Sequence, residues 1–312
     1  MPVVLNATEV WSIIFKMVIG YMETRAPIGA GRFYKKGRQD LINQIESSYL
    51  HRLGPGELPP SPIESRLSES VGLILPHAGY PFSGPVASFG YRWLARKGIP
   101  DQIVILGTNH SGRGSPVSIQ VEGKWSTPLG ELSINSELAG SLVEGCDPAE
   151  DIAHNSLDRK AFSREHSIEV QLPFLQHLYG SNIKFVPVCV RDHGMDTARQ
   201  LGDALDREVG KNVAILASSD FTHYEPPGVV NSKDEKALSA IAELDIDLFY
   251  ERVKEEKMTI CGVGAIASLL YFSRLRELEA CRLKHSTSGD VSQMNREVVG
   301  YAAVVMERSK ND

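Results

Sequence analysis

The sequence predicts a single α/β domain in which a central, mainly parallel or mixed sheet is flanked by helices. Short apolar runs alternate along the chain with longer segments of helical periodicity, and this alternation is typical of βαβ units. Most of the runs are continuously apolar, as strands that are covered on both faces must be. A prior of roughly 150 residues per domain would divide the chain in two, but no linker separates two complete halves. We therefore expect one domain.

The individual elements follow from these two patterns. Continuous apolar runs predict strands at residues 71–75, 103–106, 185–190, 213–217 and 301–306, and the alternating stretch 115–121 predicts an edge strand. Helical periodicity predicts helices at residues 38–49, 85–95, 168–178, 197–209, 232–244, 248–255 and 262–278.

The first 24 residues are set apart from this pattern. Their apolar run, residues 10–22, is shorter than the roughly 20 apolar residues that cross a bilayer, so we expect no membrane span. It also lacks the basic leader and the small-residue cleavage site of a secretory signal. Residues 1–24 are either a short helix packed on the body or, as we favour, an extension from an upstream start codon. The predicted domain is then 25–308, with 309–312 as a tail.

Composition excludes several classes of protein. A content of 42% hydrophobic and 23% charged residues is typical of a globular chain. The net charge of −6 and the 7% of aromatic residues argue against a nucleic-acid binder that is held by bulk charge and base stacking. Four scattered cysteines without a CxxC pair do not form a disulfide scaffold. A reducing cytoplasm is the expected location.

Three predicted strands are each followed by a histidine. His77 follows the strand 71–75, His110 follows 103–106, and His223 follows 213–217 with Asp220 close by. Because ligands of open parallel sheets bind beyond the carboxyl ends of the strands, we expect these side chains to converge. The spacing alone leaves open which histidines bind a metal and which one acts as a base.

Cys261 is a further candidate, because it precedes a strongly apolar predicted helix. The partial positive charge of a helix N-terminus lowers the pKa of a thiol and favours the thiolate. The alternative is a small buried filler, which is the usual role of a free cysteine. Two histidines and a thiolate with an open position would suit Fe(II), Zn or Cu.

A polar stretch at residues 164–171 is predicted to open a helix, with Ser163 or Ser167 as its cap. Its polar side chains could partly face a cleft, and of these we single out His166 and Glu169 as residues that support the ligands or contact a substrate. The alternative is the solvated first turn of a helix.

Six motifs together resemble one family. They occur in order along the chain and cover nearly everything after residue 24: RAP with AGRFY (25–34), PHAGYPFSG (76–84), LGTNHSG (106–112), EHSIEVQLPFL (165–175), SSDFTHY (218–224) and TICG (259–262). On these motifs the chain resembles the Memo family, also called AmmeMemoRadiSam system protein B. Members of that family resemble class III extradiol dioxygenases in fold.

The resemblance implies a metal centre. Class III extradiol dioxygenases hold non-haem iron with two histidines and a glutamate, and the Memo pattern has a cysteine in place of the carboxylate. Carried onto this chain, the ligands are His77, His110 and Cys261, with Fe(II) expected first and Cu or Zn as alternatives. His223 matches the family's other active-site histidine, in the position of the dioxygenase base, and Asp220 lies beside it.

The replaced ligand limits what the resemblance implies about activity. A thiolate is softer and more easily oxidised than a carboxylate, so ring cleavage does not transfer with the fold. We expect a redox or oxygen-dependent activity on an unknown small molecule. The sequence leaves two alternatives, a non-catalytic module that binds a peptide or protein in the same cleft and a metal-dependent hydrolase. The resemblance also implies radical-SAM and AMMECR-type partner proteins.

Overall fold

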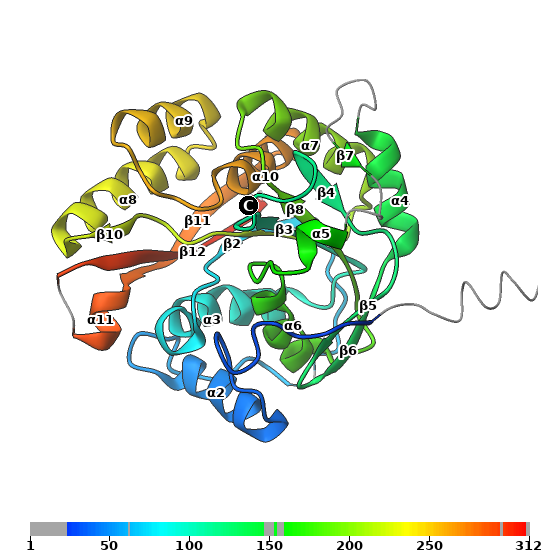
Figure 1. The fold of residues 1–312 in the computed structure, drawn as a ribbon, viewed down its shortest axis with the longest axis horizontal. Coiled ribbons are helices and arrows are strands. Elements are labelled where there is room, and N and C mark those ends of the chain that lie inside the picture. The colour runs from blue at the N-terminus through cyan, green and yellow to red at the C-terminus, as the bar shows by residue number, and fades with distance from the viewer. Residues whose placement is uncertain (1–23, 62, 147–152, 155–158, 294–295, 310–312) are drawn as a thin grey trace, which may run out of the picture.

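The computed structural model describes residues 24–61, 63–146, 153–154, 159–293 and 296–309. Apart from Thr24 and Ser309, the predicted extension 1–24 and tail 309–312 lie outside these residues. The described chain forms the predicted single α/β domain, with a mixed sheet between two layers of helices (Figure 1). None of its helices is long and apolar enough to cross a membrane.

The central sheet has the strand order β1-β5-β6-β8-β3-β9-β2-β12-β10, to which β11, β4 and β7 add at the sides. The strands are β1 (Thr24–Arg25), β2 (Val71–Leu75), β3 (Gln102–Thr108), β4 (Val117–Ile119), β5 (Lys124–Thr127), β6 (Gly130–Ile134), β7 (Ala153–His154), β8 (Lys184–Val190), β9 (Val213–Ser218), β10 (His223–Glu225), β11 (Leu278–Thr287) and β12 (Val298–Arg308). The five predicted continuous strands are therefore confirmed as β2, β3, β8, β9 and β12.

Four neighbouring strands, β8, β3, β9 and β2, run parallel at the centre of the sheet. Their side chains are buried on both faces, as the apolar runs predict, and Leu73 and Ile74 of β2 point to opposite faces with no exposed area. Burying each such side chain contributes about 1.5–3 kcal/mol to stability. All four carboxyl ends consequently meet at one edge of the sheet.

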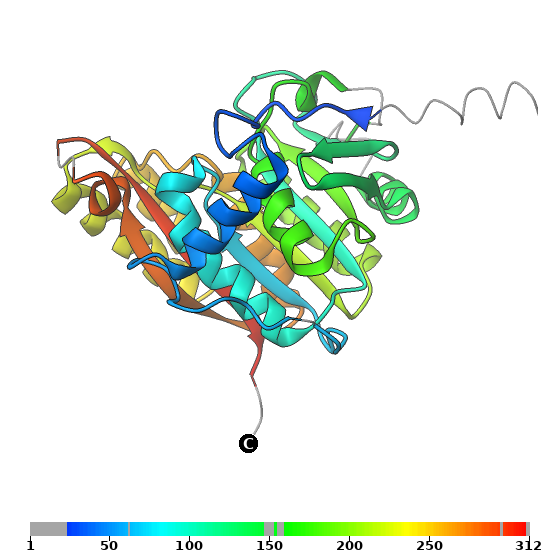
Figure 2. The same cartoon turned by 90° about the horizontal axis from the view of Figure 1, so that it is seen from below.

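The helices cover both faces of the sheet. They are α2 (Arg38–Leu50), α3 (Tyr80–Lys97), α4 (Ser136–Gly145), α5 (Arg159–Phe162), α6 (Leu172–Tyr179), α7 (Met195–Glu208), α8 (Pro227–Ala242), α9 (Ile246–Glu255), α10 (Val263–Leu275) and α11 (Ser288–Ser292). Figures 1 and 2 show α2, α3 and α6 on one face and α7 and α10 on the other. Close packing of α3 on β2 requires a glycine, because a Cβ at Gly90 would lie 2.4 Å from Cδ2 of Leu75.

Several elements differ from the prediction. The helix expected over 262–278 ends at Leu275, because Glu277 adopts a left-handed conformation with φ 55° and Leu278 opens β11. The apolar periodicity continues past the end of the helix, so the predicted helix was too long. Strand β11 was missed because its burial pattern is mixed and, among the described strands, it pairs with β12 alone. The helix expected over 168–178 begins with a 3₁₀ turn at Glu169–Gln171, and residues 164–168 are not helical.

Candidate metal centre

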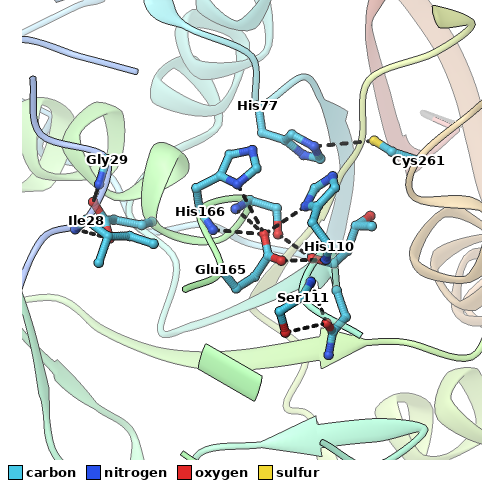
Figure 3. A network of polar contacts seen from close by, with 12 residues as sticks. Ile28, Gly29, His77, His110, Ser111, Glu165, His166 and Cys261 are labelled. Atoms are coloured by element: carbon cyan, nitrogen blue, oxygen red, sulfur yellow. Dashed lines mark hydrogen bonds and ion pairs between the residues drawn. The ribbon is translucent and has the colours of Figure 1, made fainter. Parts of the chain in front are cut away.

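A pocket of about 530 Å³ lies beyond the carboxyl ends of β2, β3 and β9. It is lined by Phe33, His77, Ala78, Gly79, His110, His166, Asp220, His223, Tyr224, Thr259, Cys261, Val299 and Tyr301. The structure thus brings to one place the three strand-end histidines, Asp220 and Cys261, as strand-end convergence predicts. Figure 3 shows Cys261 beside His77, with the rings of His110 and His166 also next to His77 and Glu165 below them.

His77 is buried two residues beyond β2, and its tautomer follows from its neighbours. Its Nδ1 lies 3.1 Å from the Ser218 hydroxyl at the end of β9. That hydroxyl donates its single hydrogen to the Ser167 carbonyl at 2.7 Å and accepts the Gln171 amide at 2.7 Å, so it can only accept from His77. The proton of His77 is therefore on Nδ1, and the Nε2 lone pair is free to accept a ligand.

His110 is oriented in the same way by a buried carboxylate. Its Nδ1 donates to Glu165 at 3.0 Å, and its backbone N–H donates to the other carboxylate oxygen at 2.6 Å. The backbone N–H groups of His166 and Ser167 both donate to Glu165 at 2.8 Å. Burial alone would raise the pKa of Glu165, but these hydrogen bonds outweigh burial and lower it to about 2. Glu165 is therefore a permanent acceptor that outweighs burial and raises the pKa of His110, and in the neutral ring it holds the proton on Nδ1 and leaves Nε2 for a ligand.

His166 completes a cluster of three imidazoles. One ligand nitrogen from each of His77, His110 and His166 lies within 4.8 Å of the other two. The ring of His166 stacks on Phe33 at a centroid distance of 4.1 Å and on His110 at 4.7 Å. Burial lowers the pKa of both His77 and His166 to about 3, and mutual repulsion adds to the shift. Both rings are therefore neutral at neutral pH, which is the form that binds a metal.

Cys261 lies on the other side of His77. Its Sγ is 3.3 Å from Nε2 of His77 and accepts the backbone N–H of Asp220 at 3.1 Å. Burial and the Asp220 carboxylate raise the pKa of the thiol well above its usual range, which is the opposite of the lowering expected from its place before a helix. Desolvation outweighs the N-terminus of α10. The sulfur carries a proton that a bound cation would displace.

Asp220 and His223, the predicted catalytic pair, both line the pocket. One oxygen of the buried Asp220 accepts the backbone N–H groups of His77 at 2.8 Å and Ala78 at 3.3 Å, and burial raises the pKa of this carboxyl group. Nδ1 of His223 lies 2.8 Å from the Thr259 carbonyl, which can only accept. In its neutral form the His223 ring therefore carries its hydrogen on Nδ1 and leaves Nε2 to accept a proton, as a general base requires.

Glu169 does not face the pocket, contrary to the sequence-based expectation. Its fully buried carboxylate pairs with Arg25 at 2.5 Å and accepts the backbone N–H groups of Ile28 and Gly29 at 3.0 and 2.7 Å, and the Tyr34 hydroxyl at 2.6 Å. Because residues 164–168 are not helical, the polar stretch does not present one continuous face. Glu169 instead anchors the N-terminal segment. This segment includes Phe33, whose ring stacks on His166.

Sequence reasoning missed the residues that orient the imidazoles. Glu165 belonged to the polar stretch but could not be distinguished from Glu169 without its partner His110. Ser218 is the last residue of an apolar run, and no sequence pattern reveals the direction of its hydroxyl. Thr259 braces His223, because its side-chain oxygen accepts the His223 backbone N–H at 2.7 Å. The only available signal was that all of these residues lie inside the shared motifs.

Comparison with known proteins agrees with the motifs. The family model described as Memo-like protein matches residues 25–305. A MEMO1 family protein of Methanopyrus kandleri is 43% identical over 91% of this chain and 99% of its own, and one of Thermotoga neapolitana is 44% identical over 90% and 99%. A solved structure of an uncharacterized Escherichia coli K12 protein covers 75% of this chain and 98% of its own at 14% identity, with a TM-score of 0.47. The chain is a member of the Memo family.

Proposed function

We propose that the pocket is a mononuclear metal centre in which His77, His110 and Cys261 bind one transition-metal ion, and that this centre supports a redox or oxygen-dependent reaction. One observation carries the proposal: the ligand nitrogens of His77 and His110 belong to a cluster of imidazoles within 4.8 Å of one another. Nδ1 of each ring is taken up by a fixed acceptor, Ser218 or Glu165. Metal-binding histidines are typically oriented by such acceptors.

The donor set fits a transition metal better than a hard cation. Neutral imidazoles suit Fe(II), Zn and Cu, and a sulfur ligand shifts the preference toward the softer ions. Among the residues that the structure describes, Asp220 is the only carboxylate that lines the pocket, and one of its oxygens already accepts two backbone N–H groups. Mg²⁺ and Ca²⁺ prefer several oxygen ligands. We propose Fe(II) first, with Cu and Zn as alternatives.

When bound, a redox-active ion would supply electron transfer or the activation of oxygen. The chain's own groups would bind and move protons around it. Nε2 of His223 would accept a proton from a substrate, because the Thr259 carbonyl holds the ring proton on Nδ1. Asp220, whose pKa is raised by burial, would return one. Phe33 and Tyr301 would provide apolar walls that exclude water.

Metal analysis of protein purified without oxygen tests the proposal. We expect close to one ion of iron or copper per chain, and none in the double variant His110→Ala with Cys261→Ala. The matched control is His51→Ala with Cys281→Ala, which removes a histidine and a cysteine that do not line the pocket. Full occupancy in the pocket variant would refute the ligand assignment, provided that its circular dichroism shows a folded chain.

A second test concerns turnover. Oxygen consumption by the iron-loaded protein is measured with catechol-like and thiol substrates, with the His223→Asn variant in parallel. We expect consumption that depends on both the ion and His223. Consumption that is equal in the wild type and the variant would remove His223 from the mechanism.

One surface feature favours a second function, a module that binds a peptide or protein, including the radical-SAM and AMMECR-type partners. Tyr224 lines the pocket with 73% of its surface exposed, and its backbone has the unusual φ of 57°. Strained, exposed aromatic residues occur at binding sites. A partner that binds equally well after chelation of the metal, and more weakly to Tyr224→Ser, would favour this function over catalysis.

A further inference from the structure

Two candidate ligands lie next to the pair formed by His77 and His110. The sulfur of Cys261 is 3.3 Å from Nε2 of His77. His166 approaches from another side, with a ring nitrogen within 4.8 Å of a nitrogen of both other histidines. Cys261 is not part of this mutually close set. The pocket therefore holds a three-imidazole group that is complete without the sulfur.

The nitrogens of His166 have no hydrogen-bond partner among the described residues. An oxygen of Glu165 lies 3.6 Å from Nδ1, an ion-pair contact that is beyond hydrogen-bond range. Yet the ring is only 19% exposed, and a half-buried imidazole usually finds a partner. His77 and His110 each have an acceptor at Nδ1. Among the described residues, no hydrogen bond thus fixes the ring nitrogens of His166, whereas the other two rings of the cluster are already oriented.

Stacking holds the His166 ring without using its nitrogens. Phe33 lies parallel to it within 17°, and His110 within 24°. Phe33 belongs to the segment that Glu169 fastens through Tyr34 and through backbone groups. Ligand atoms around a tetrahedral zinc ion, with Zn–N distances of about 2.1 Å, lie roughly 3.4 Å apart. The three nitrogens would need to approach one another by at most about 1.4 Å, which small side-chain rotations provide.

We infer that His166 is a metal ligand and that the pocket offers two ligand sets which share His77 and His110. Three imidazoles would hold a divalent ion such as Zn²⁺, and the sulfur of Cys261 would replace His166 for a soft monovalent ion such as Cu⁺. Imidazole suits zinc and other divalent ions, whereas thiolate selects Cu⁺. This inference rests on the proposed function, because both sets need the shared pair.

Competition titrations of the full chain test it with Zn²⁺ and Cu⁺ as separate probes under anaerobic conditions. We expect His166→Gln to weaken Zn²⁺ binding by at least roughly 100-fold and to leave Cu⁺ binding unchanged. Losing a residue that only hydrogen-bonds to a metal ligand already costs up to about 100-fold in affinity, and losing a ligand should cost more. Cys261→Ser should do the reverse. His51→Gln and Cys281→Ser are the matched controls, since neither residue lines the pocket. His166→Phe serves as a second variant, because it keeps a stacking ring and lacks a nitrogen.

The outcomes separate the two proposals. If the wild type binds neither ion, the proposed metal centre fails and this inference fails with it. Two results would leave the metal centre standing and refute the three-imidazole set, provided that the wild type binds both ions. One is that Cys261→Ser loses Zn²⁺ binding, and the other is that both His166 variants keep Zn²⁺ binding. A crossed pattern, in which each variant loses only its own ion, supports the inference.

Discussion

The Ser218 hydroxyl determines which nitrogen of His77 faces Cys261. It accepts Nδ1–H at 3.1 Å because its own hydrogen is donated to the Ser167 carbonyl, and this leaves Nε2 of His77 3.3 Å from the sulfur. Ser218 ends β9 and His77 follows β2, and the two strands pair in parallel with Ser218 beside Leu75. Strand pairing in the core therefore sets the chemistry of a pocket ligand.

Ser218→Ala is expected to release this constraint. The Nδ1–H of His77 would lose its acceptor, the ring would populate the other tautomer, and zinc affinity would fall about 10–100-fold. Nitrogen chemical shifts of His77 in metal-free protein report the tautomer directly. Ser88→Ala is the control, because Ser88 is equally buried and its hydroxyl bonds only to the Pro85 and Ser48 carbonyls. An unchanged His77 tautomer would contradict the assignment.

Glu165→Gln and Glu169→Gln form a matched pair, because both carboxylates are fully buried and accept several hydrogen bonds. Each variant should lose roughly 3 kcal/mol of unfolding free energy, since breaking a buried charged pair costs about 3–5 kcal/mol. Only Glu165→Gln should also weaken zinc binding, because Glu165 orients His110 whereas Glu169 pairs with Arg25. Urea unfolding and zinc titration separate the two effects. Equal zinc affinities would remove Glu165 from the support of the centre.

The lowered pKa of His166 makes stability depend on pH. In the unfolded chain the ring titrates near 6.5, whereas in the folded chain burial lowers its pKa to about 3. Below pH 6.5 the unfolded state binds the extra proton, so stability is lost as the pH falls from 6.5 towards 3. Between pH 7 and pH 5 this ring should cost about 2 kcal/mol. His77 acts in the same direction, and His110, whose pKa is raised, opposes it.

His166→Phe isolates this contribution, because the variant keeps the stack on Phe33 and removes the titrating group. Urea unfolding of metal-free protein at pH 7 and pH 5 should show a smaller loss of stability in the variant than in the wild type. A loss of the same size in both proteins would mean that His166 is protonated in the folded chain.

Gly300→Ala should destabilise the protein and shift the segment that positions His223, although Gly300 does not line the pocket. A Cβ at Gly300 would lie 1.8 Å from Oδ2 of the buried Asp234, which accepts the backbone N–H of Thr222 and pairs with His285. Displacing Asp234 would cost about 3 kcal/mol or more and loosen the loop that carries His223. Thermal unfolding measures the loss. Gly140→Ala in α4, with nothing within 4 Å, should instead stabilise the protein by up to about 1 kcal/mol.

The sequence predicts the centre of the fold and the place of the site because both depend on strong local patterns. Strands β2, β3 and β9 are continuously apolar, and the histidines that follow β2 and β3 need only the parallel pairing of these strands to meet. The outer strand β11 could not be found in this way, because it has one partner and no continuous buried face.

Roles within the site depended on contacts that no pattern encodes. Glu165 and Glu169 lie four residues apart, and a helix would have placed them on one face, yet one orients His110 and the other fastens Arg25. The protonation of Cys261 was mispredicted for a related reason. The sequence shows the helix terminus that would lower the pKa of the thiol. The burial and the nearby Asp220 carboxylate that raise this pKa exist only in the folded chain.

The wide spacing of the pocket residues has a consequence for biosynthesis. The candidate ligands come from residue 77 to residue 261 and meet only after β2, β3 and β9 have paired and α10 has packed beside them. A growing polypeptide cannot assemble the ligand set that includes Cys261 before that residue has been made and α10 has packed, and contacts of such long range form late in folding. An ion that needs the sulfur could therefore not nucleate the folding of this protein. Such an ion would bind late, and its binding would indicate that the chain has been made at least as far as α10 and has folded around the pocket.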